Sequence, residues 1–421
     1  MHLFARRRDS RAASRTRTPH FGFAVGPAPT RAADPPGRRA RRRARPEAEA
    51  LDRRLLMASG PQGLADATDL ADRVALALKP DFASDQFPGI SVAVVIDGQV
   101  ALAQGYGLGD VATGSPVQAD TRFDIGSLTK TVTALGVLLL YQESQGTSHP
   151  LDLDAPIGDY LHNTKLFKLP RQWSQVTIRE LLDMSSGIPN VGDARPKRAK
   201  LASIANEPLL YAPGTQASYS NTNYDLLGEL IEQWTGQRYG TFIQDQILGP
   251  LGMSATQVLG QSATVPDQAV GYGAPRHGKW PRARVLNGQA MYAAAGMVST
   301  AQDMATYMTA LLSGWLLDPA TYALMWTSTP TRQHGVKSPS DASYGLGWDT
   351  AIDTSAGPTE VTKGGNVPGY TSQLILYPSS DSGVFVSINT SHGGQDPSGG
   401  TAFQVAEAVY QAVQTGALTG R

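Results

Sequence analysis

The chain has 421 residues, of which 41% are hydrophobic and 17% are charged, and it contains 44 glycines and 28 prolines. This composition excludes a collagen-like repeat, a coiled coil and a chain that is disordered throughout. The length allows one large mixed domain or two domains. Because the chain has no cysteine, disulfide bonds, thiolate metal sites and cysteine nucleophiles are excluded as well.

The net charge is zero, with 36 basic and 36 acidic residues, but the charges are unevenly distributed. Residues 1–54 contain 15 arginines and no lysine against five acidic residues, so this segment carries about +10 and the remainder about −10. We predict that residues 1–60 are an Arg-rich, disordered leader and that residues 61–421 form the folded domain. The alternative is an arm that binds nucleic acid or an anionic membrane by neutralising phosphates.

The N-terminus shows no ordinary secretory signal, because its best apolar stretch, Phe21 to Val25, is short and is soon followed by Pro27. The longest apolar run, near Ala134 to Tyr141, suits a buried helix and is too short to span a membrane. We therefore expect no transmembrane segment, and the compartment stays open. The histidines have no spacing typical of metal ligands, so we expect no metal either.

The first elements after the leader are a helix and a hairpin. Leu64 to Leu78 has helical spacing with an apolar face. Ile90 to Ile96 is a β-branched run, Asp97-Gly98 is a two-residue turn signal, and Val100 to Tyr106 follows as a second strand. The pattern predicts an antiparallel hairpin next to the first helix.

Segments with helical periodicity fill the middle of the chain, and strands return near its end. The expected helices are Leu128 to Glu143, Ile178 to Met184, Asn223 to Thr235, Tyr239 to Ile247 and Ala301 to Ser313. The expected strands are Tyr344 to Asp349, Thr371 to Tyr377 and Gly383 to Asn389, before a closing helix from about Ala402 to Val413. We predict an α+β fold with one antiparallel sheet built from N- and C-terminal strands, flanked by the first and last helices, and an inserted helical subdomain.

A Ser-x-x-Lys motif, Ser127-Leu128-Thr129-Lys130, begins the first central helix. On a helix this spacing puts both side chains on one face, where a neutral amine could take the proton of the serine hydroxyl as its oxygen attacks a carbonyl. Alone the motif is weak, because an N-cap serine followed by an exposed lysine gives the same pattern. Two further motifs accompany it: Tyr219-Ser220-Asn221 before a helix, and Lys363-Gly364-Gly365 before the strand Thr371 to Tyr377.

In this order the motifs resemble those of the serine β-lactamase and penicillin-binding protein superfamily, in particular its class C branch with related esterases and D-amino-acid peptidases. The resemblance implies a β-lactamase/transpeptidase-like fold. It includes further landmarks, which are Phe123-Asp124-Ile125-Gly126, Ile178 to Leu182, Ser186 to Pro189, Pro250 to Met253, Ala294 to Met297 and Tyr344 to Trp348.

The residue types and the resemblance together give each motif residue an expected role. Ser127 is the nucleophile, and Lys130 accepts its proton if burial or a nearby positive charge, for which Lys363 is the candidate, keeps part of the amine neutral. Tyr219 relays protons between Ser127, the leaving group and water, with the neighbouring ammonium groups favouring its phenolate. In the family, the asparagine of the second motif, here Asn221, faces the acyl side of the substrate.

The third motif is expected to support the tetrahedral intermediate. Family geometry supplies oxyanion donors from the backbone N–H of the nucleophile, Ser127, and of the residue three positions after the strand lysine, Asn366. Gly364 and Gly365 would let substrate approach the strand edge, with a plain turn before the strand as the alternative. Gly364 replaces the hydroxyl residue of dedicated β-lactamases, so one donor to a β-lactam carboxylate is absent. Many relatives have histidine where this chain has Met184, to which we assign no role.

We therefore expect a class C-like serine hydrolase that forms an acyl-enzyme on Ser127 and cleaves a small ester, amide or peptide, with no cofactor. Esterase, D-aminopeptidase or carboxypeptidase activity is favoured over efficient β-lactamase activity. The three motifs would meet in a cleft between the sheet and the helical subdomain. One alternative is a non-catalytic β-lactam-binding or scaffold protein on the same fold, and another is an adaptor that binds through the Arg-rich leader. By resemblance, the location would be periplasmic or extracellular, with the cytoplasm as the alternative.

Overall fold

The computed structural model of the protein describes residues 61–161, 169–191, 197–204, 206–260, 264–286, 288–327, 332–333, 343–353, 357–391 and 400–419. The predicted leader, residues 1–60, lies outside this part of the chain.

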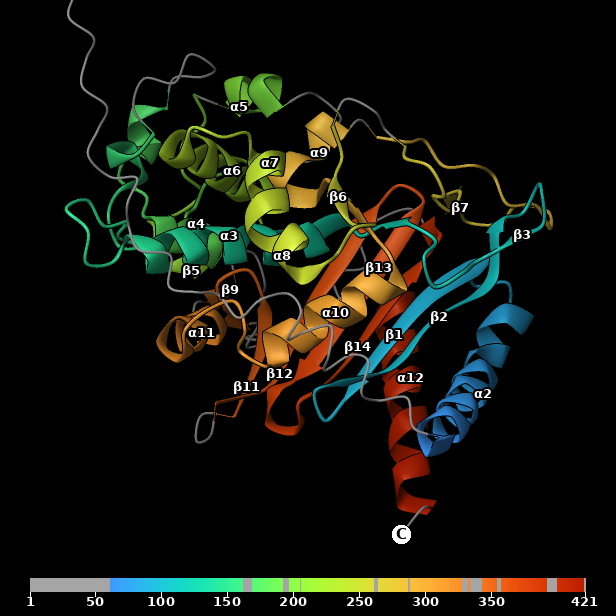
Figure 1. Ribbon diagram of the computed structural model, residues 1–421. Coiled ribbons are helices and arrows are strands. Elements are labelled where there is room, and N and C mark those ends of the chain that lie inside the picture. The colour runs from blue at the N-terminus through green and yellow to red at the C-terminus, as the bar shows by residue number, and fades with distance from the viewer. Residues whose placement is uncertain are drawn as a thin grey trace, which may run out of the picture. The chain divides into compact units, whose positions relative to one another are not determined.

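An eight-stranded antiparallel sheet forms the centre of the fold, in the strand order β10-β11-β12-β13-β14-β1-β2-β3 (Figure 1). Its strands are β1 (Gly89–Ile96), β2 (Gln99–Asp110), β3 (Ser115–Pro116), β10 (Ser343–Tyr344), β11 (Asp349–Asp353), β12 (Gly357–Val367), β13 (Tyr370–Tyr377) and β14 (Ser382–Ile388). The N-terminal and C-terminal strands join where β1 pairs with β14, with Ile90 opposite Ile388. This arrangement confirms the predicted sheet assembled from both ends of the chain.

The helices are α2 (Pro61–Ala83), α3 (Thr129–Ser144), α4 (Ile178–Leu182), α5 (Lys197–Ile204), α6 (Asn221–Thr235), α7 (Tyr239–Ile243), α8 (Gly249–Leu251), α9 (Gly288–Ala295), α10 (Ala301–Leu312), α11 (Pro319–Trp326) and α12 (Gly400–Thr419). Shorter helical turns are η1 (Gly126–Leu128), η2 (Ile157–Asp159), η3 (Arg171–Trp173), η4 (Gln244–Leu248) and η5 (Pro378–Ser380). Short strands outside the main sheet are β4 (Phe123–Asp124), β5 (Gln216–Ala217), β6 (Gln257–Val258), β7 (Tyr272–Gly273), β8 (Met297–Ser299), β9 (Arg332–Gln333) and β15 (Thr390–Ser391).

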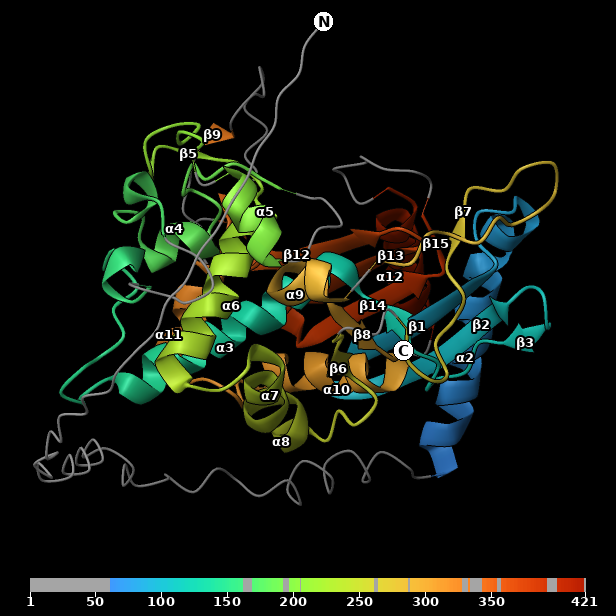
Figure 2. The ribbon, with the colours of Figure 1, turned by 90° about the horizontal axis from the view of Figure 1, so that it is seen from above.

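Helices cover both faces of the sheet (Figure 1 and Figure 2). The side chains along each strand point alternately into two hydrophobic cores, one on each face. One core packs α2 and α12 against one face of the sheet through Leu70, Val74, Leu78, Val92, Val94, Ile375, Val384, Val386, Val405 and Val409. The other core places Ala93, Val95, Leu374 and Phe385 on the face of α3 and α10. Alternate strand residues point to opposite faces, and therefore a strand that is apolar throughout is covered on both sides.

Local signals in the sequence explain where several helices begin and end. Thr177 caps α4 together with Glu180, each side chain accepting a hydrogen bond from the other residue's backbone N–H. Thr300 caps α10 by accepting from the N–H of Asp303. Helix α6 ends at Gly236, which adopts the left-handed conformation (φ +69°) that glycine accepts without steric cost.

The structure corrects the sequence prediction at the C-terminal strands. Of the segment Tyr344 to Asp349, predicted as one strand, only the two end residues lie in strands, and residues 345–348 form the turn between β10 and β11, in which Gly347 adopts φ +93°. Strand β12, which carries Lys363, was absent from the predicted strands. Its paired glycines and central charged residue give it a weak strand signal.

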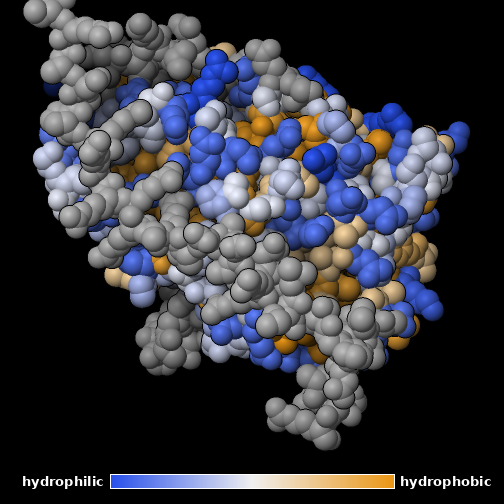
Figure 3. All heavy atoms as spheres, in the orientation of Figure 1, coloured by the Kyte–Doolittle hydropathy of each residue, from blue (hydrophilic) through white to orange (hydrophobic). Residues whose placement is uncertain are grey.

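Hydrophilic residues cover much of the face shown in Figure 3, with hydrophobic residues in smaller groups between them. Among the described residues, no helix combines enough length with enough apolar character to cross a membrane.

Candidate active site

Ser127 lies in the turn η1, which connects the short strand β4 to helix α3. Several hydrogen bonds hold this turn against the rest of the fold. The Asp124 carboxylate accepts from the N–H of Gly126 at 3.0 Å, and the hydroxyl of Ser372 on β13 donates to the carbonyl of Ile125 at 2.9 Å. Because these contacts fix both the turn and the neighbouring sheet strand, the nucleophile is held at the junction of the sheet and the helical part.

Lys130 lies one turn further along, at the start of α3, and its side chain is fully buried. Its Nζ donates to Ser127 Oγ at 3.2 Å, to Asn221 Oδ1 at 2.7 Å and to the carbonyl oxygen of Ala294 at 2.8 Å. Three acceptors around one nitrogen match the three N–H groups of an ammonium. These contacts suit an ammonium, and the expected neutral fraction of Lys130 stays a prediction, because the Ser127 hydroxyl can also donate to a neutral amine.

Tyr219 brings its hydroxyl to the nucleophile from the loop that precedes α6. Its oxygen shares a hydrogen bond of 2.5 Å with Ser127 Oγ, and it donates to Asn221 Oδ1 at 3.4 Å. Either oxygen can be the donor in the short bond, because the serine and the phenol each carry one proton and both can accept one. A serine proton directed to the tyrosine oxygen is one of the two arrangements that this contact allows.

We call Ser127, Lys130, Tyr219 and Asn221 the serine cluster. The first two motifs, which lie about ninety residues apart in the sequence, meet in it. Asn221 directs its amide oxygen to Lys130, because an ammonium only donates. Its NH₂ group is then the part that can face a substrate, and the contact to the acyl side stays a prediction.

Burial raises the pKa of Tyr219 above its ordinary value, and the Asp349 carboxylate adds to this rise, while the hydrogen bond with Ser127 lowers it. The neighbouring ammonium groups lie over the ring, with Nζ of Lys130 at 4.7 Å and of Lys363 at 5.5 Å from its centroid. Burial is the largest contribution to this shift, so the environment of Tyr219 favours the neutral phenol over the phenolate that we expected.

The loop that carries Tyr219 is held by hydrogen bonds to residues for which we predicted no role. Met184 has a left-handed backbone (φ +64°), and its sulfur accepts from the N–H of Ser220 at 3.4 Å. Asn190 accepts from the N–H of Asn221 at 2.9 Å. Such contacts fix the loop relative to α4, so the hydroxyl of Tyr219 is held in place by the backbone.

The third motif lies on strand β12, which faces η1. A side chain built on Gly126 would come within 2.9 Å of the backbone nitrogen of Asn366, so the two segments with the expected oxyanion donors lie against each other. Gly365 is packed against the carbonyl of Ile125, while Gly364 faces the side chain of Gln373 on the opposite side of the strand. The alternative of a plain turn for these glycines is wrong, because both lie within the strand.

Lys363 is buried and forms an ion pair with Asp349, at 3.0 Å between Nζ and Oδ1. We call these two residues the lysine–aspartate pair. Because Asp349 compensates its charge, Lys363 contributes less positive charge to the serine cluster than the sequence led us to expect.

Two participants in the site escaped the sequence reading. The carbonyl of Ala294 binds Lys130, and a backbone acceptor leaves no signal in the residue type. Asp349 follows the Tyr344 to Trp348 landmark directly, and this position was the available clue. Within the described ranges, no group of three or more His, Asp or Glu residues is placed to hold a metal ion.

Comparison with known families matches residues 33–408 to the family described as Beta-lactamase, so the chain belongs to the β-lactamase family. Protein flp of Staphylococcus aureus (strain COL) is 27% identical over 333 residues, covering 76% of this chain and 63% of flp. A D-aminopeptidase of Gluconobacter oxydans is 29% identical over 190 residues, covering 44% of this chain and 35% of that protein. The chain thus spans less than two thirds of the length of these curated relatives.

Among solved structures, the D-amino acid amidase of Ochrobactrum anthropi SV3, in complex with D-phenylalanine, superposes with a TM-score of 0.69 at 25% identity. The match covers 83% of this chain and 99% of the amidase. The superfamily expected from the three motifs and the β-lactamase/transpeptidase fold are both confirmed.

Proposed function

We propose that the protein is a class C-like serine hydrolase that cleaves small esters or amides through an acyl-enzyme on Ser127. The observation that carries this proposal is the 2.5 Å hydrogen bond between Ser127 Oγ and Tyr219, with Lys130 donating to the same serine oxygen. A nucleophile in contact with both a proton acceptor and a cation is the arrangement that hydroxyl activation requires.

The acylation step follows from the contact between these two hydroxyl groups, with the serine as the donor. As Ser127 Oγ attacks the substrate carbonyl, its proton passes to the oxygen of Tyr219, and the phenolic proton of Tyr219 passes to the leaving oxygen or nitrogen. The bond between the carbonyl carbon and the leaving group then breaks, which leaves an ester on Ser127. This relay starts from a neutral phenol, the form that the raised pKa of Tyr219 favours.

Lys130 has an electrostatic part in this scheme. Its ammonium stabilises the negative charge that develops on Ser127 Oγ and on Tyr219 while the protons move. Deacylation reverses the relay: a water proton passes to Tyr219, the phenolic proton returns to Ser127 Oγ, and the acid is released.

The developing oxyanion is assigned to the backbone N–H groups of Ser127 and Asn366, which belong to segments in close contact. The substrate class is supported by the similarity to a D-aminopeptidase and a D-amino acid amidase. Gly364 provides no hydroxyl for a β-lactam carboxylate. We therefore expect esters and amides of small acyl groups, D-amino acid amides among them, to be better substrates than β-lactams.

The first test is covalent labelling of the nucleophile. A fluorophosphonate probe should add the mass of one bound probe to the peptide that contains Ser127. The variant Ser127→Ala should lose both the label and the hydrolysis of activated esters. Ser148→Ala, at an exposed loop serine, is the matched control and should keep both. Labelling that persists in Ser127→Ala would show that another residue is the nucleophile.

A further inference from the structure

The two charged side chains of the lysine–aspartate pair differ in their exposure to solvent. The side chain of Lys363 is only 3% exposed, whereas that of Asp349 is 42% exposed. A molecule that arrives from solvent therefore meets the carboxylate of this pair, and the ammonium lies behind it. The ammonium of Lys130 is likewise fully buried and already bound to three acceptors.

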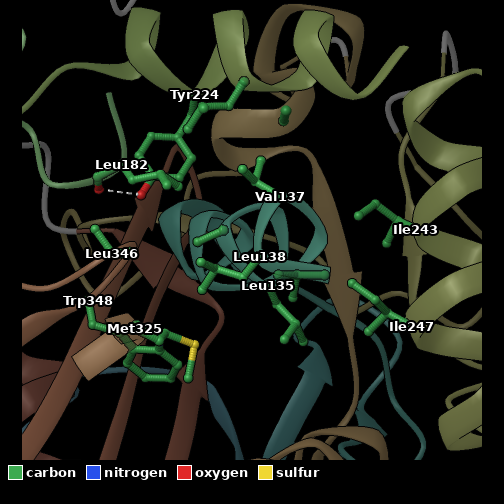
Figure 4. Packing of buried hydrophobic residues seen from close by; sticks show 14 of the residues in the cluster. Leu135, Val137, Leu138, Leu182, Tyr224, Ile243, Ile247, Met325, Leu346 and Trp348 are labelled. Carbon is green, nitrogen blue, oxygen red and sulfur yellow. Dashed lines mark hydrogen bonds between the residues drawn. The ribbon is translucent and has the colours of Figure 1, made fainter. Parts of the chain in front are cut away.

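Asp349 is held in this position by a rigid segment of the core. Trp348 and Leu346 are buried among the residues around α3, as Figure 4 shows. Between them Gly347 adopts φ +93°, and a Cβ on this residue would lie 2.6 Å from the side chain of Ala134. A side chain that directly follows such an anchored turn, at the start of β11, has little freedom to move away from Lys363.

The charge of Asp349 acts on two tyrosine side chains, one of which belongs to the serine cluster. Its carboxylate contributes to the raised pKa of both Tyr219 and Tyr344, and Nζ of Lys363 lies 5.5 Å from the ring centroid of Tyr219 and 5.9 Å from that of Tyr344. Because Coulomb interactions are stronger in a partly buried site than in water, we expect a charged substrate group next to the scissile carbonyl to interact with this carboxylate.

We propose that Asp349 sets the charge preference of the site: it favours substrates that carry an ammonium group near the scissile carbonyl and disfavours those that carry a carboxylate there. This inference rests on the proposed function. Asp349 acts in two ways, because it attracts the ammonium directly and compensates the charge of Lys363 that would otherwise attract a carboxylate.

The test compares three methyl esters whose acyl chains differ at one position. Methyl butyrate carries a methyl group, monomethyl succinate a carboxylate and β-alanine methyl ester an ammonium at the same place in the chain. All three release methanol, so kcat/KM is measured with one assay. The quantity of interest is the ratio of kcat/KM for the ammonium ester to that for the carboxylate ester.

In the wild type we expect this ratio to exceed one, and in Asp349→Asn we expect it to fall at least about tenfold. Asp349→Glu, which keeps the carboxylate, should retain most of the preference. Asp159→Asn makes the same change at an exposed residue outside the site and is the matched control. A purely structural role of Asp349 would lower all three rates together and leave the ratio unchanged.

A ratio that stays within about twofold of wild type in an active Asp349→Asn variant would overturn the inference while the proposed function stands. Failure of the wild type to hydrolyse methyl butyrate would instead count against the proposed function. If Asp349→Asn does not fold, the wild-type ratio is measured at low and high ionic strength. Screening should reduce it, and a ratio that is insensitive to salt would overturn the role of Asp349.

Discussion

Tyr219 is the residue on which the proposed proton relay depends most directly, because its oxygen is 2.5 Å from Ser127 Oγ. Tyr219→Phe removes only the phenolic oxygen and keeps the ring. We expect kcat to fall by about 10²- to 10⁴-fold, the usual contribution of a general acid–base group, with a much smaller change in substrate binding. Steady-state kinetics with an activated ester measures this loss.

Mass spectrometry of the same variant separates the two half-reactions. If Tyr219 mainly serves deacylation, the acyl-enzyme on Ser127 should accumulate, whereas Lys130→Met should slow acylation and leave little adduct. Tyr106→Phe removes a hydroxyl on β2 that donates to the backbone carbonyl of Ala71 on α2 at 3.3 Å, and it serves as the control. If kcat of Tyr219→Phe stays within about threefold of wild type, the loss is far smaller than the weakest general acid–base effect, and the relay is excluded.

Asp124 is a second residue whose environment has a measurable consequence. Burial raises its pKa from 3.8 to about 7, although the hydrogen bond from Gly126 lowers it. The folded state therefore binds a proton that the unfolded state has already lost above pH 3.8. The protonated carboxyl is the form that the folded state tolerates. The protein therefore keeps its full free energy of unfolding below pH 3.8 and loses part of it as the pH rises through about 7.

Asp124→Asn replaces this carboxyl by a neutral group that still accepts a hydrogen bond. The variant should gain stability relative to wild type as the pH rises, with the gap in unfolding free energy widening by roughly 3 kcal/mol between about pH 5 and pH 8. Urea unfolding at both pH values measures the gap. Asp120→Asn, at an exposed residue nearby, should show no such trend. Parallel pH dependence of Asp124→Asn and wild type would contradict the buried charge.

Strand β12 shows how an element can determine the geometry of the site without supplying a reactive group. A Cβ on Gly365 would lie closer than 3.0 Å to the carbonyl oxygen of Ile125 and to Ser372 Oγ, both of which hold the turn η1. A Cβ on Gly364 would lie 3.1 Å from the end of the flexible Gln373 side chain. The close approach of strand and turn therefore depends on Gly365.

Gly365→Ala should push η1 away from β12 and separate the two expected oxyanion donors. We expect kcat/KM to fall by about 10²-fold or more, as for the loss of one oxyanion donor. Gly364→Ala should lose clearly less activity. Circular dichroism and thermal unfolding of both variants test whether the folded state is kept. Equal losses in the two variants would show that the close approach is not what matters.

The sequence motifs predicted some residues of the site and missed others, depending on the element that carries each residue. Ser127, Lys130, Tyr219 and Asn221 carry chemistry in their residue types, and their motifs were sufficient to bring them together. Asp349 escaped because its partner lies on the neighbouring strand, and a pairing between strands has no fixed spacing in the sequence. The protonation states of Tyr219 and Lys130 depend on burial and on acceptors from distant segments, which the motifs do not reveal.

The antiparallel sheet was predictable because strands from both ends of the chain have strong signals in the sequence. The hairpin β1–β2 has β-branched residues and an Asp-Gly turn, and β14 has an apolar centre, Val384 to Val386. The pairing of β1 with β14 could be inferred from strands at both ends flanking a helical centre. The irregular helices of the centre were harder to predict, since α9 contains a kink at Tyr292 with φ +37°.

The last prediction concerns the leader, residues 1–60, and rests on composition alone because these residues lie outside the described part of the chain. They are rich in arginine and poor in large apolar residues, so they can contribute little buried apolar surface. Their removal should leave the thermal midpoint and kcat/KM of the remaining chain essentially unchanged.

The opposite charges of leader and body offer one route by which this prediction could fail. If the arginines bind the acidic body, their removal should lower the thermal midpoint at low ionic strength, and the difference should vanish at high salt. Binding of full-length protein to DNA and to anionic vesicles, measured as a function of salt, tests the adaptor alternative in parallel. Salt-dependent binding that disappears with residues 1–60, without any change in kcat/KM, would make the leader a separate targeting arm on an independent hydrolase.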